Sequence, residues 1–233
     1  MTETRRRIFE LDALRGLCIL GMVIVHLVLD WHMFIGGFTF SPVFVFVRSW
    51  GGVLFILISG ICVTLGHHPI KRGAVVLGCG LLVSAVTWGM EFFGFAADVM
   101  IWFGILHCLG VCMLVAPVFA RLPKWALPVL GLCMIAAGFW VHTLTVEPAY
   151  LFPLGLMRAD FASADYFPLL PNLGWFLLGM FAGKTLYAPR KTLLPKVNEN
   201  VFPLPFLCWC GRQSLWIYLL HQPVLFGLFY LLA

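Results

Sequence analysis

The amino-acid sequence predicts an all-α fold, a polytopic transmembrane bundle of about seven helices that forms a single domain over residues 1–233. Of the 233 residues, 62% are hydrophobic and only 11% are charged, against roughly 25% charged residues in soluble domains. A soluble core of this length cannot bury so much apolar surface, so we expect the lipid bilayer to cover much of it. The net charge of +5 is spread over short loops, which argues against nucleic-acid binding.

The predicted helices follow from the lengths of the apolar segments. A helix needs about 20 mostly apolar residues to cross the hydrocarbon core. Most connections between such segments are short, so consecutive helices should be antiparallel neighbours. The segments that meet this length are 12–34, 43–66, 73–94, 99–120, 125–145, 168–187 and 205–232.

The basic residues predict the orientation of the chain. With seven spans, only Arg48 and Arg158 lie on one side of the membrane, beside several acidic residues. Cytoplasmic segments carry the excess of Lys and Arg, so we expect a cytoplasmic N-terminus in the inner (plasma) membrane. The basic residues of the cytoplasmic side are Arg5, Arg6, Arg7, Lys71, Arg72, Arg121, Lys124, Lys184, Arg190, Lys191 and Lys196.

The first span has one polar face. At about 100° per residue, Asp12, Arg15, Met22, His26 and Asp30 fall within roughly 80° of one another, and His26 lies ~16 Å beyond Arg15 along the axis. Ionisable residues at this depth are candidates for function. We expect Asp30, one turn after His26, to accept a hydrogen bond from it and fix its tautomer. The structural alternatives are an interfacial Asp12–Arg15 ion pair and a packing hydrogen bond of His26.

The intermediate spans contain fewer polar residues. Ser59 lies beside Gly60 in the second span, and His107 lies in the fourth. Each has a packing role as its alternative to a functional one. The eight cysteines lie in apolar segments without a CxxC pair, which predicts free thiols and no metal site.

The last predicted span, 205–232, begins with a second polar cluster. Ser214 and His221 share one face of it, and Arg212 lies at its cytoplasmic end, at the level of Arg15. Two arginines at the cytoplasmic mouth suit an anionic ligand such as a nucleotide cofactor. Snorkelling of both side chains to lipid phosphates is the alternative.

Five motifs follow one another along almost the whole chain. In this order they resemble the catalytic-domain family of heparan-α-glucosaminide N-acetyltransferase, in its short bacterial form. The first motif alone is shared with the wider group of multipass acyltransferase-3-like enzymes. The motifs are Glu10-Leu11-Asp12-Ala13-Leu14-Arg15-Gly16 with Met22 and His26, Phe55–Gly60, Ile105–Val111, Asp165–Gly174, and Gly211–Ser214 with His221-Gln222-Pro223.

The resemblance implies acetyl transfer across the membrane, from cytosolic acetyl-CoA to a sugar or glycan acceptor on the far side. His26, oriented by Asp30, would act as general base or form an acetyl-histidine intermediate, and the resemblance leaves His32 as the other candidate for this position. The acceptor would enter beside Asp165 and Tyr166. The residues expected to bind the acyl-CoA are Arg15, Arg212, Ser214, His107 and His221.

Two other functional classes remain as alternatives. A proton-coupled transporter or permease would use the same intramembrane acids and histidines as a relay, although the sequence lacks the internal repeat that many transporters have. A haem-binding redox protein would use His26, His107 and His221, and would absorb near the Soret band. Because a seven-helix unit is small for a closed cavity, a homodimer is left open.

Overall fold

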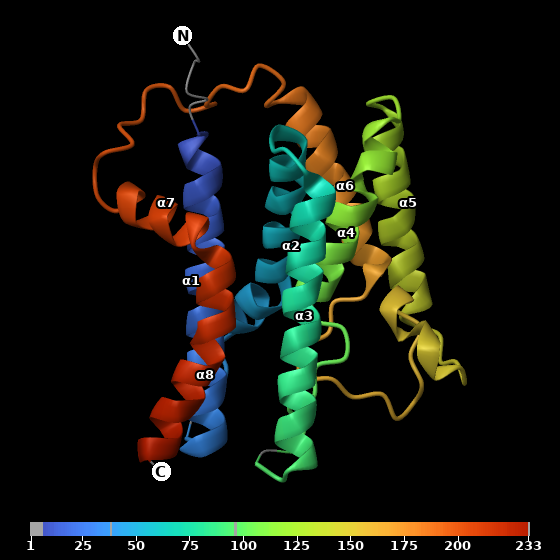
Figure 1. Cartoon of the computed structure of the whole chain (residues 1–233), viewed down its shortest axis with the longest axis vertical. Coiled ribbons are helices and arrows are strands. Elements are labelled where there is room, and N and C mark those ends of the chain that lie inside the picture. Colours follow the sequence, from blue (N-terminus) through green and yellow to red (C-terminus); the bar gives the residue numbers. More distant parts are fainter. Residues whose placement is uncertain (1–6, 38, 96, 233) are drawn as a thin grey trace. The chain divides into compact units, whose positions relative to one another are not determined.

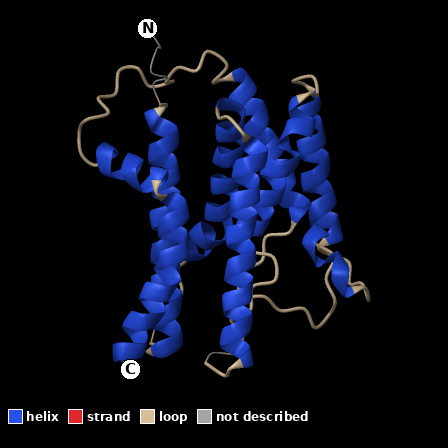
Figure 2. Cartoon of the chain, viewed as in Figure 1, coloured by secondary structure: helices blue, strands red, loops and turns tan. Residues whose placement is uncertain are grey.

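The computed structural model describes residues 7–37, 39–95 and 97–232, and the regular secondary structure in this part of the chain is helical (Figure 2). The predicted all-α fold is confirmed for these residues. A 3-10 helix, η1, covers Ala149–Leu154. The α-helices are α1 (Phe9–Phe34), α2 (Pro42–Leu65), α3 (Pro69–Phe92), α4 (Ile105–Ala120), α5 (Ala126–Val141), α6 (Leu169–Thr185), α7 (Leu204–Arg212) and α8 (Ser214–Leu232).

Three helices, α1, α2 and α3, are long and apolar enough to cross a membrane. Helices α4 and α5 and the segment Ser214–Phe229 of α8 are also apolar but shorter. With the composition, these helices identify the chain as a membrane protein. The count of seven spans and the orientation stay predictions.

Two of the predicted spans differ from the observed helices. Residues 99–104 precede α4 without joining it, because the backbone there bonds to another loop: Phe167 N–H donates to Phe103 O and Ala164 N–H donates to Met100 O. The predicted span 205–232 is two helices, α7 and α8, separated at Gln213, whose φ of −94° and ψ of 11° are not helical.

The described residues form two compact units, and each is described by itself. The prediction of a single domain over residues 1–233 stays a prediction. The first unit comprises residues 1–58 and 186–233, with α1, α7, α8 and most of α2. In Figure 1, α8 runs beside α1, and α7 crosses α1 near its start.

The crossing of α1 and α7 depends on two glycines. A Cβ at Gly16 would overlap the carbonyl oxygen of Leu207, and a Cβ at Gly211 would overlap that of Asp12. Beside this crossing, Phe9, Ala13 and Cys208 form a small buried core. The two helix backbones therefore lie in direct contact.

The loop before α7 is tied to the start of α1. The Glu10 side chain is buried, and its two carboxylate oxygens accept hydrogen bonds from Thr192 Oγ1 at 2.8 Å and from Leu193 N–H at 2.7 Å. A carboxylate in the first turn of a helix also interacts favourably with the helix dipole. Glu10 thus fixes the loop of Thr192 and Leu193 at the start of α1.

The second unit, residues 59–185, contains the end of α2 and helices α3 to α6. Its helix pairs also meet at glycines: α3 and α4 at Gly73 and Gly110, and α5 and α6 at Gly131 and Gly174. Small residues let helix backbones approach closely, and the resulting van der Waals packing is one of the forces that hold helices together in lipid.

Replacement of Gly174 by leucine is expected to destabilise the α5–α6 pair. A Cβ at this position would lie 2.5 Å from the carbonyl oxygen of Gly131 and 2.8 Å from Ile135 Cγ1, and overpacking of this kind costs about 1–3 kcal/mol. The measurement is thermal unfolding of the detergent-solubilised protein. Gly78→Leu is the matched control, because a Cβ at Gly78 has no neighbour within 4 Å; equal unfolding temperatures for the two variants would contradict this packing.

Candidate functional site

Arg15 and Ser214, predicted on separate helices to bind the same ligand, are in contact. Arg15 Nη2 donates a hydrogen bond to Ser214 Oγ at 2.7 Å, and the guanidinium lies 6.0 Å from the centroid of the Phe55 ring. Ser214 is the first residue of α8 and is buried. Arg15 Nε is buried without a hydrogen-bond partner, so this guanidinium retains a donor for a further group.

Arg212 takes a different position. It is exposed and lines a hollow of about 250 Å³ in the first unit. The Asp12 carboxylate also lines this hollow and interacts electrostatically with Arg7, Arg15 and Arg212. Both predicted arginines therefore belong to one charged region at the start of α1, although only Arg212 lines the hollow. The remaining lining residues are Arg7, Phe9, Glu199, Asn200, Pro205 and Cys208.

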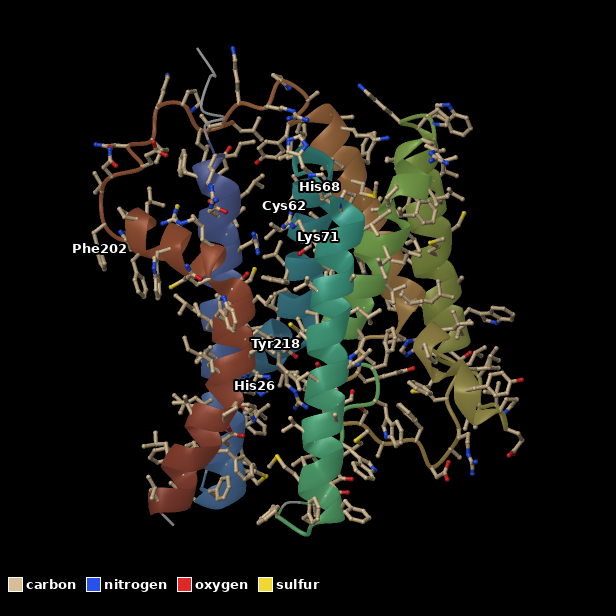
Figure 3. All side chains as sticks on the ribbon, in the orientation of Figure 1. His26, Cys62, His68, Lys71, Phe202 and Tyr218 are labelled. Atoms are coloured by element: carbon tan, nitrogen blue, oxygen red, sulfur yellow. The ribbon has the colours of Figure 1, made fainter. Side chains whose placement is uncertain are left out.

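The structure brings His26 of α1 against His221 of α8. Their ring centroids are 4.9 Å apart in an edge-on arrangement, and the Tyr218 ring lies 5.5 Å from that of His221. Figure 3 shows His26 and Tyr218 on these two helices. His221 Nδ1 bonds to the backbone carbonyl of Tyr218; a carbonyl only accepts, so Nδ1 carries the proton and neutral His221 has its lone pair on Nε2.

The predicted hydrogen bond between Asp30 and His26 is not formed in the described part of the chain. Asp30 is 5% exposed, and its Oδ1 accepts a hydrogen bond of 3.4 Å from Gln222 Nε2 instead. Asp30 faces α8, where Gln222 follows His221. The sequence did not lead us to predict a role for Gln222, although it lies in the motif His221-Gln222-Pro223, which indicated that the residue could matter for function.

His32 lies outside this group of side chains. It is exposed in the last turn of α1, and its ring packs 5.0 Å from that of Phe40. Six residues after His26, a helical side chain points about 120° away from it. The geometry therefore places His26, and not His32, against α8.

His107 belongs to the second unit and has both ring nitrogens engaged there. Gly104 N–H donates to Nδ1 at 3.2 Å, and Nε2 lies 3.2 Å from Ser84 Oγ, which itself donates to Ile101 O. The proton is therefore on Nε2. This arrangement fixes the start of α4 against α3.

Asp165 and Tyr166 fix the loop that precedes α6. Asp165 Oδ2 accepts from Ile105 N–H at 3.1 Å, at the N-terminus of α4, where a carboxylate is favourable. Tyr166 donates to Phe152 O at 2.6 Å. Burial raises the pKa of Tyr166 to about 12, so its hydroxyl stays a hydrogen-bond donor at neutral pH.

The predicted absence of a metal site stays a prediction, although the described residues contain no cluster of three or more His, Cys, Asp or Glu side chains able to hold a metal ion. Nothing in these residues or in the comparisons supports the homodimer left open above.

Comparisons with known proteins bear on the family of the chain. A search of curated proteins and a search of solved structures found no match. The family model described as "Heparan-alpha-glucosaminide N-acetyltransferase, catalytic" matches residues 7–223, and so spans both units. The chain therefore belongs to this family of membrane acetyltransferases.

Proposed function

We propose that the protein transfers an acetyl group from cytosolic acetyl-CoA to a hydroxyl or amino group of a sugar or glycan on the outer side of the inner membrane, with His26 as general base. Family membership supports the class of reaction. The observation that carries the assignment of residues is the order of the polar contacts along α1.

These contacts lie at two levels of α1. The Arg15–Ser214 bond lies near the start of the helix, and the His26–His221 contact lies ~16 Å further along it. With a cytoplasmic N-terminus, a CoA nucleotide would bind at the first level. The acyl thioester of the CoA would reach the second level, at His26 and His221, where the acceptor arrives from the outer side of the membrane.

The donor would be held by the charged region at the start of α1. Arg15 has a buried Nε donor without a partner, and Ser214 holds the rest of the guanidinium in place. Arg212, in the neighbouring hollow, adds a second positive charge. Arginine–phosphate hydrogen bonds are among the strongest polar contacts in proteins, so this region suits the phosphates of CoA.

The transfer step would use the lone pair of neutral His26. The acceptor oxygen or nitrogen attacks the thioester carbonyl carbon while His26 removes its proton, and the C–S bond then breaks. The CoA thiolate leaves and takes up a proton, so that the acetylated acceptor and free CoA are the products. His221, in ring contact with His26, would position the base.

On the acceptor side, the loop of Asp165 and Tyr166 remains our candidate for contact with the sugar. Each side chain already makes a hydrogen bond within the second unit. We therefore propose that the Asp165 and Tyr166 side chains hold this loop in its conformation, and that the loop they hold contacts the sugar. His107, with both ring nitrogens bonded, has the corresponding role at the start of α4.

The test is binding of acetyl-CoA to the purified protein, followed by release of CoA in the presence of sugar acceptors. Arg15→Ala is expected to weaken acetyl-CoA binding by about 10- to 100-fold, because a hydrogen bond to a charged group contributes about 1.5–3 kcal/mol. Calorimetry measures this change.

Arg121→Ala is the matched control for Arg15→Ala, because Arg121 is an exposed cation at the end of α4. It should bind acetyl-CoA as the wild type does. Absence of acetyl-CoA binding by the wild type would refute the donor assignment, and equal affinities of Arg15→Ala and Arg121→Ala would refute the role of Arg15.

A further inference from the structure

Three hydrogen-bond acceptors are buried without a donor where α1 meets α8. They are Oδ2 of Asp30, Oε1 of Gln222 and Nε2 of His221. Asp30 is 5% exposed and His221 is 9% exposed. Asp30 and Gln222 are joined by a hydrogen bond, and His221 is the residue before Gln222.

A buried acceptor that lacks a donor costs about 1–3 kcal/mol, and more if it is charged. Three of them at one helix contact are therefore costly unless a bound group supplies hydrogen atoms. Native proteins leave few buried polar atoms unsatisfied, and those that remain often mark a function. With the Asp30 carboxyl group ionised, all three atoms only accept hydrogen bonds, so the missing group must be a donor.

The position of these atoms indicates where that donor comes from. Asp30 lies four residues before Phe34, the end of α1, and so ~6 Å from the end opposite Arg15. His26 lies one turn deeper, against His221. A molecule that enters from this end of α1 meets Asp30 and Gln222 before it meets His26.

We propose that Asp30 and Gln222 form a subsite that binds an amino or hydroxyl group of the acceptor substrate, beside the His26–His221 pair. This inference rests on the proposed function and on the predicted orientation of α1. The amino or hydroxyl group donates to Asp30 Oδ2 and Gln222 Oε1. The Gln222 amide holds the other oxygen of Asp30, so Gln222 both binds the acceptor and positions the carboxylate.

The same chemistry sets the selectivity of the subsite. A carboxylate and an amide carbonyl attract donors, and an ammonium group most strongly because it is charged. A carboxylate or phosphate on the ligand would meet two acceptors and be repelled. The subsite therefore separates the acceptor from the anionic acyl-CoA, which belongs at the opposite end of α1.

The inference is tested by thermal unfolding of the full chain in detergent, with glucosamine and glucose as probes. We expect at least one probe to raise the unfolding temperature of the wild type. Stabilisation by glucosamine alone identifies an amino group as the ligand, and equal stabilisation by glucose identifies hydroxyl groups. The shift should disappear in Gln222→Met and in Asp30→Asn.

Gln213→Met is the matched control and should keep the shift, because Gln213 lies between α7 and α8, away from Asp30. In the transfer assay, Gln222→Met should raise the KM for the acceptor at least about tenfold, the equivalent of one charged hydrogen bond. The KM for acetyl-CoA should not change, and this distinguishes a subsite from a general structural defect.

Two results would overturn the inference: no stabilisation of the wild type by either probe, or stabilisation that persists in both Gln222→Met and Asp30→Asn. Binding of acetyl-CoA, measured on the same samples, reports separately on the proposed function. If the protein binds acetyl-CoA but neither probe raises its unfolding temperature, the proposed function is retained and this subsite is refuted. A protein that binds the probes but not acetyl-CoA has the subsite and a different activity.

Discussion

Replacing His26 by alanine is expected to lower the rate of CoA release by ~10²–10⁴-fold, the usual contribution of a general base. Acetyl-CoA binding should be unchanged, because the Arg15–Ser214 contact lies about three helical turns away. The measurement is the initial rate of thiol formation from acetyl-CoA with a sugar acceptor, together with the Kd of acetyl-CoA. In His26→Ala the rate of thiol formation should fall, and the Kd of acetyl-CoA should equal that of the wild type.

His32→Ala is the matched control for this experiment. His32 lies on the same helix but is exposed and packs against Phe40, so its loss should change the rate less than about threefold, a small effect beside that of a general base. A large loss of rate in His32→Ala with normal activity in His26→Ala would reverse the assignment. Normal rates in both variants would exclude a histidine of α1 as the base.

Helical periodicity predicts which residues share a face, but not what that face contacts. The polar face of α1 was predicted because Arg15, His26 and Asp30 recur at helical spacing. The partners come from α8, almost 200 residues later. The sequence did not predict the bond between Arg15 and Ser214. Asp30 bonds to Gln222 and not to its helical neighbour His26.

The helix boundaries also depend partly on contacts that the sequence pattern does not predict. Apolar segments give the approximate positions of the helices. The break at Gln213 was not predicted, because the segment 205–232 is apolar on both sides of it. Two residues before the break, Gly211 closely approaches the backbone of α1, and composition does not encode such a tertiary contact.

The roles of His107 and Asp165 could not be separated from ligand binding by sequence alone. An intramembrane histidine is a candidate for function wherever it occurs. Only the structure identifies Gly104 and Ser84 as the hydrogen-bond partners of His107. The capping of α4 by Asp165 likewise joins residues 60 positions apart, a separation that no local pattern reports.

Substitution of Gly16 by leucine is expected to have the largest effect on stability. The new side chain would overlap the carbonyl oxygen of Leu207, and a backbone atom cannot move aside as a side chain can. We expect a loss of about 3 kcal/mol or more, the upper end of the cost of overpacking. Thermal unfolding in detergent measures the loss.

Gly21→Leu, on the same helix, is the matched control, because a Cβ at Gly21 has no neighbour within 4 Å. It should unfold near the wild-type temperature. Since only Gln213 separates α7 from α8, displacement of α7 should also move Ser214 away from Arg15 and weaken acetyl-CoA binding in Gly16→Leu alone. If Gly16→Leu unfolded at the temperature of Gly21→Leu and bound acetyl-CoA equally well, the α1–α7 crossing would not set the position of the Arg15–Ser214 pair.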